Sequence, residues 1–71
     1  MHASGIDRIV LEPERRAITG VSRTGWWRFE KDGTAPRRIP ISANRVGWAL
    51  SELQSWVQAR IAERDAERDA A

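Results

Sequence analysis

The sequence contains no cysteine and a single histidine, which narrows the chemistry open to it. Without cysteine the chain forms neither a disulfide framework nor a thiolate metal site, and this composition is compatible with a reducing compartment. The histidine, His2, lies beside the N-terminus in a segment without hydrophobic periodicity. We interpret it as a bystander, and we expect no metal and no other cofactor.

Long hydrophobic runs are missing as well. No stretch approaches the ~20 apolar residues of a membrane-spanning helix, and the N-terminus lacks the apolar core of a signal peptide. We therefore expect a soluble cytoplasmic protein that has no membrane partner and no small-molecule substrate. With no nucleophile–base pair, no paired carboxylates in a predicted element and no phosphate-binding glycine loop, the sequence argues against an enzyme.

The charge that is present is unevenly distributed over the 71 residues. Residues 15–45 hold eight basic side chains against two acidic ones, whereas residues 61–71 hold four acidic side chains against two basic ones. Such asymmetry predicts a polyanionic partner for the central segment and a solvated tail. Arginine outnumbers lysine, which favours bidentate recognition of phosphate or guanine, although a GC-rich coding bias produces the same excess.

Local signals divide the first third of the chain into three parts. Residues 1–8 read as a flexible arm, and the β-prone run 9–11 as an edge strand. Pro13 suits the first turn of a helix, where its missing N–H costs nothing. We expect this helix to end near Thr19, with Gly20 as its left-handed terminal residue.

A second helix is predicted directly after this turn. Ser22 is a favourable N-cap, and Gly33 ends the helix after about Lys31. Helical periodicity places Val21, Trp26 and Phe29 on an inner side. The same periodicity places five residues on the outer side: Arg23, Thr24, Trp27, Arg28 and Lys31.

The pattern changes to a period of two between Arg37 and Trp48, which predicts a small hairpin. Its turn falls at 42–45 and its return strand at 46–48. Pro40 cannot donate a ladder hydrogen bond, so its strand should be an edge.

The last predicted element is a helix that begins at Ser51, with Gln54 completing a capping box. An apolar stripe follows at Leu53, Trp56, Val57 and Ile61. We expect this helix to fray over 62–71, a charged tail outside a domain spanning 9–61.

The order of strand, helix, turn, helix, hairpin and helix indicates an α+β, mostly α, winged helix-turn-helix domain. In this layout the second helix enters the major groove of double-stranded DNA, and the hairpin lies along a neighbouring groove or the backbone.

The stretch 11–60 also resembles the AlpA family of phage and prophage regulators, which are distantly akin to MerR-type and excisionase domains. The matching residues are TGVSRT at 19–24, WR at 27–28, Glu30, Gly33, PR at 36–37, VGW at 46–48, SEL at 51–53, WV at 56–57 and AR at 59–60. Three departures stand out: Gly25 replaces a helix former, Trp26 replaces Leu or Ile, and the turn 42–45 lacks glycine.

The layout assigns roles to the basic and polar side chains of the second helix. Arg23 and Thr24 occupy its first turn, where base edges are read, while Arg28 and Lys31 are expected to neutralise phosphates. Ser22 is chiefly a cap that can also meet a phosphate. Arg37, Arg38 and Arg45 are expected to charge the wing.

Two side chains of the second helix, Trp27 and Glu30, each have two possible interpretations. An outward Trp27 either stacks on the sugar–phosphate backbone or closes the core beneath the hairpin, and the sequence leaves both open. Glu30 is expected to pair with a nearby arginine rather than to act as a catalytic acid. Trp48 and Trp56 are expected in the core.

These observations predict a sequence-specific DNA-binding protein associated with the nucleoid. The resemblance implies transcriptional control or an architectural role in excision for a phage or mobile element. So small a reader is expected to bind as two copies, a homodimer or a cooperative pair, on adjacent half-sites. The alternative is a basic helical adaptor for an acidic protein partner such as an integrase or polymerase subunit.

Overall fold

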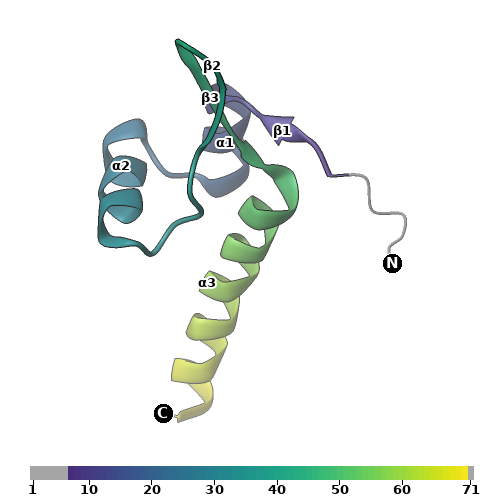
Figure 1. The fold of residues 1–71 in the computed structure, drawn as a ribbon. Helices are drawn as coiled ribbons and strands as arrows, with labels where there is room; N and C mark the ends of the chain where they lie inside the picture. The colour runs from purple at the N-terminus through teal and green to yellow at the C-terminus, as the bar shows by residue number, and fades with distance from the viewer. Residues whose placement is uncertain (1–6, 71) are drawn as a thin grey trace.

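The structure is a computed structural model that describes residues 7–70. Its elements follow in the order β1 (Ile9–Val10), α1 (Glu12–Thr19), α2 (Arg23–Asp32), β2 (Ile39–Ser42), β3 (Arg45–Ala49) and α3 (Leu50–Ala70). The three strands form one antiparallel sheet in the order β1-β3-β2, so β1 and β2 are its edges. Figure 1 shows the β2–β3 hairpin at one end of the molecule and α3 leading away from the other. This is the winged helix-turn-helix predicted from the sequence.

The turn between α1 and α2 forms as the local signals predict. Pro13 lies in the first turn of α1, and Gly20 ends the helix with φ of 72° and donates its N–H to Arg16 O at 2.8 Å. Ser22 then caps α2, because its Oγ accepts the N–H of Gly25 at 3.2 Å. Two residues therefore separate the end of one helix from the cap of the next, which fixes their relative orientation.

An aromatic core holds α2 against α3 and the sheet. Trp26 is 1% exposed and meets the rings of Phe29 and Trp56 edge-on, with centroids 6.4 Å and 5.1 Å away. Trp48 and Leu53 are also buried, and Trp56 packs against them while it keeps part of its surface exposed. The core thus accommodates the larger ring of Trp26, and α2 continues helically through Gly25.

A charged side chain lies inside this core. Arg15 is 0% exposed, and its guanidinium pairs with both carboxylate oxygens of Glu12 and donates to Val21 O at 2.7 Å. The guanidinium also donates to Thr19 Oγ1 at 3.2 Å. Arg15 is one of the eight basic residues of 15–45 that we expected to face a polyanion, and its burial removes it from that set. Its hydrogen-bond partners close the α1–α2 turn, so its role is structural.

The start of α3 differs from the prediction. The helix begins at Leu50, and Ser51 donates its N–H and its hydroxyl to the carboxylate of Asp7, at 3.0 Å and 2.5 Å. Ser51 is therefore not the N-cap, and the capping box with Gln54 was wrong. The acceptor is instead Asp7, which belongs to the segment predicted as a flexible arm. In the same segment, Arg8 O accepts the N–H of Leu50 at 2.8 Å.

The far end of α3 also departs from expectation. The helix remains continuous through the charged repeat to Ala70, where we expected fraying. Ile61 is 36% exposed, so the buried part of the apolar stripe ends before it. Residues 1–6 of the predicted arm lie outside the described residues.

Candidate nucleic-acid interface

The outer side of α2 carries a row of exposed polar and aromatic side chains. The five predicted outer residues are all exposed: Arg23, Thr24, Trp27, Arg28 and Lys31. Among the side chains that the structure describes, those of residues 7–68, no ion pair includes any of the three cations of this set. We call this set the outer face of α2. It presents hydrogen-bond donors and positive charge that internal partners do not satisfy.

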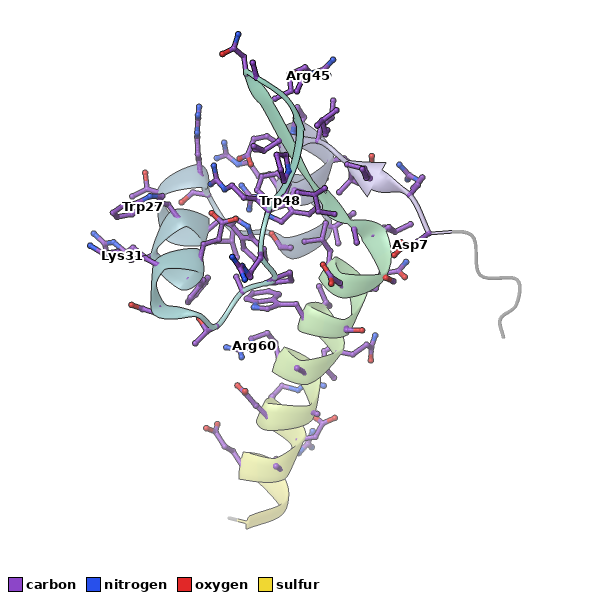
Figure 2. The ribbon with its side chains drawn as sticks, in the orientation of Figure 1. Asp7, Trp27, Lys31, Arg45, Trp48 and Arg60 are labelled. Carbon is purple, nitrogen blue, oxygen red and sulfur yellow. The ribbon has the colours of Figure 1, made fainter. Side chains whose placement is uncertain are left out.

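Trp27 is the apolar member of the outer face. Its side chain is 52% exposed, and the ammonium of Lys31 lies 5.0 Å from the ring centroid. Figure 2 shows both side chains directed away from the core. Of the two readings that the sequence left open, the structure excludes the one in which Trp27 closes the core.

The hairpin contributes charge at its tip. Arg45 is the first residue of β3, directly after the β2–β3 turn, and its side chain is exposed (Figure 2). Arg37 is exposed too, but it precedes β2 and lies outside the hairpin. The wing therefore carries Arg45 itself, and Arg37 and Arg38 belong to the segment that enters it. The hairpin that was predicted to start at Arg37 therefore starts two residues later.

Arg38 connects that segment to α2. Its guanidinium donates to Glu30 Oε1 at 2.6 Å, and the indole N–H of Trp48 donates to Glu30 Oε2 at 2.8 Å. The hydrogen bond to Glu30 and the negative charge of this carboxylate raise the pKa of Arg38 above its ordinary value. Glu30 is thus the structural partner of a nearby arginine, as predicted. The network holds the wing at a fixed position beside α2.

A hollow lies between the start of α2 and the hairpin. It is lined by Glu12, Arg23, Arg38, Val46 and Trp48. Arg23, a member of the outer face, therefore lies close to the hairpin. The start of α2 and the hairpin therefore border one hollow, as is expected of a helix and a wing that contact the same duplex.

Burial and pairing reduce the number of cations available to a ligand. Of the eight basic residues in 15–45, Arg15 is buried and Arg38 is paired with Glu30. Six cations remain that are exposed and, among the described side chains, unpaired: Arg16, Arg23, Arg28, Lys31, Arg37 and Arg45. The acidic side chains of α1 are occupied, since Glu12 pairs with Arg15 and Glu14 with Arg8. The pair between Arg8 and Glu14 lowers the pKa of Glu14.

Neither a metal centre nor a membrane-spanning helix is found in the part of the chain that the structure describes. The described side chains, residues 7–68, contain no group of three His, Cys, Asp or Glu arranged to hold a metal ion. None of the described helices is long and apolar enough to cross a membrane.

The chain is similar in sequence to a known protein family and to a phage protein. Residues 8–61 match the family model described as prophage CP4-57 regulatory protein (AlpA). The chain is similar to an uncharacterized protein, ORF88, of Enterobacteria phage P4: 30% identity over 64 residues, covering 90% of this chain and 73% of that protein. No solved structure gives a significant match.

Proposed function

This chain belongs to the AlpA family of prophage regulatory proteins, and we propose that it acts by binding double-stranded DNA at a specific sequence. The observation that carries the proposal is the outer face of α2, a helix that follows a tight turn and exposes cations without internal ion-pair partners. In this layout such a helix enters the major groove.

Within the outer face we assign different roles by position along α2. Arg23 and Thr24 lie in the first turn, so we propose that they contact base edges, with Ser22 close enough to the backbone to meet a phosphate. Arg28 and Lys31 lie further along the helix and are proposed to neutralise phosphates. Arg45 at the hairpin tip would contact the neighbouring groove or backbone, with Arg37 before β2 as a further cation, while Arg38 keeps its pair with Glu30.

The output of such binding would be control of transcription or an architectural role in excision, at a promoter or attachment site of a phage or mobile element. One module of this kind buries only ~600–1,000 Å² on DNA. We therefore propose that two copies bind adjacent half-sites, about one helical turn apart. The protein would be found in the cytoplasm on the nucleoid.

The proposal is tested by selecting binding sites from random duplexes with the full chain. We expect enrichment of one motif and a large ratio of specific to non-specific affinity. Arg23→Ala should weaken binding to the selected site by about 1–3 kcal/mol, if Arg23 contacts a guanine, and leave the circular dichroism of the protein unchanged. Arg64→Ala, in the distal part of α3, is the matched control and should bind as the parent does.

Failure to enrich any motif at low salt would contradict the proposal. In that case an acidic protein partner, such as an integrase or polymerase subunit, would have to occupy the outer face of α2.

A further inference from the structure

Trp27 is the most exposed large hydrophobic side chain among residues 7–70, with 52% of its surface accessible. It lies one helical turn after Arg23 and one turn before Lys31, so the three side chains form a single row along α2. Trp27 is therefore in the middle of the outer face and not at its margin. The apolar ring is surrounded by cations and a hydroxyl that recognise polar groups.

The major groove that α2 would enter presents both polar and apolar groups. The edges of the base pairs in the major groove present hydrogen-bond donors and acceptors, and one apolar group, the methyl on C5 of thymine. 5-Methylcytosine carries the same methyl at the same position. An indole has one N–H and otherwise an apolar surface, so most of the Trp27 ring cannot form hydrogen bonds with the polar groups of the base edges.

Lys31 strengthens the assignment of the ring to the groove. Its ammonium lies 5.0 Å from the centroid of Trp27, an arrangement in which the cation is attracted to the ring face. This contact orients the ring in the free protein. It also places a positive charge next to it, where a phosphate beside the contacted base can be met.

We propose that Trp27 reads the C5-methyl group of a pyrimidine, thymine or 5-methylcytosine, in the major groove. This inference rests on the proposed DNA binding and adds to it a specificity determinant that works by apolar contact. Burial of the methyl against the ring removes apolar surface of both partners from water. A base without the methyl leaves part of the ring facing water.

The test uses the selected duplex and the full chain. Each thymine is replaced in turn by uracil, which removes the methyl and keeps the hydrogen-bonding edge. At one position in each half-site we expect the parent to bind about fourfold more weakly, the effect of about one buried methylene-sized group. Cytosine paired with guanine at that position should also bind weakly, and 5-methylcytosine should recover about the same factor.

Trp27→Ala should bind thymine and uracil duplexes equally at that position, and its circular dichroism should match the parent because the ring is exposed. The matched control is Ile61→Ala, which truncates an exposed apolar residue of α3, 36% exposed, far along the chain from α2. It should keep the full discrimination of the parent.

The outcomes separate this inference from the proposed function. Equal affinity of the parent for every uracil duplex and no effect of cytosine methylation overturn the reading of a methyl group, while DNA binding itself stands. Discrimination that persists in Trp27→Ala overturns the assignment to this residue. A Trp27→Ala variant with parental DNA affinity also overturns it, and would make Trp27 an anchor for a protein partner.

Discussion

The guanidinium carbon of Arg15 lies 4.9 Å from the centre of the Trp26 ring, so a cation stands in the middle of the aromatic core. It also lies 5.7 Å from the centre of Trp48, and α1, α2 and β3 meet at this one side chain. A buried charge is tolerated when its partners are present, and here Glu12 and Val21 O supply them.

Arg15→Met should therefore destabilise the fold. We expect a loss of about 3 kcal/mol, at the low end of the range for breaking a buried pair, because Glu12 keeps 35% exposure and can be resolvated. Urea denaturation followed by circular dichroism measures the change. Arg16→Met, at an exposed position on the same helix, should stay within about 0.5 kcal/mol of the parent. Equal stability of the two variants would contradict a structural role for Arg15.

Gly47 allows the edge strand β1 to approach β3. A Cβ at this position would lie 2.3 Å from Ile9 Cγ2 and 2.8 Å from Val10 O. The carbonyl is backbone and cannot rotate away, so Gly47→Ala should separate the strands and cost roughly 1–3 kcal/mol. Thermal denaturation of Gly47→Ala and of the double variant with Ile9→Ala tests this. The second change should restore only part of the stability, and full recovery would show that the side chain of Ile9 alone limits the approach.

The contact between Asp7 and Ser51 predicts a pH dependence. The hydrogen bonds from the Ser51 hydroxyl and backbone lower the pKa of Asp7 below 3.8, its ordinary value. A group with a depressed folded pKa stabilises the protein fully above its unfolded pKa, and this contribution is lost as pH falls through the folded pKa. Asp7→Ala should therefore melt at a lower temperature than the parent at neutral pH, and the difference should shrink as pH falls below 3.8.

Melting curves of the parent and Asp7→Ala across this range give the comparison, with Glu67→Gln on the distal part of α3 as the control. The Arg8–Glu14 pair is common to all three proteins, so it cancels in the difference. A melting difference that stays constant down to the lowest pH would contradict a charge-dependent cap.

Salt dependence reports how many of the six exposed and unpaired central cations meet phosphates. If about five do so, the slope of log K against log salt should be about −4 to −5 per protomer. Arg28→Ala should weaken binding to all duplexes alike and reduce the magnitude of the slope by about one. Arg68→Ala should leave the slope as it is. A slope near zero on every duplex would end the DNA proposal.

The distal part of α3 is predicted to be dispensable. Side chains 62–68 are exposed, and the Arg60–Glu63 pair has exposures of 43% and 61%, where ion pairs contribute about 1 kcal/mol or less. Deletion of residues 62–71 should leave the melting temperature and the DNA affinity close to those of the full chain. A melting temperature lowered by many degrees, or the loss of a dimer in sedimentation, would show that this segment packs on a second molecule.

The helices α1 and α2, the turn between them and the outer face of α2 were predictable because neighbours in the chain determine them. Pro13, Gly20 and Ser22 act within a few residues of their own positions. Helical periodicity places Trp26 and Trp27 on different sides of α2, whatever surrounds them. The pattern of TGVSRT, VGW and SEL carried the family resemblance in the same way. These features require no knowledge of which distant residues meet.

The partners of charged side chains were decided only by the tertiary structure. Nothing local distinguishes buried Arg15 from exposed Arg16, because burial depends on where Trp26 and Trp48 come to lie. The carboxylate that binds Ser51 comes from Asp7, and that of Glu30 joins Arg38 to Trp48. Such pairs are fixed by the docking of whole elements, whose free energy comes mainly from apolar burial, so sequence spacing alone cannot identify them.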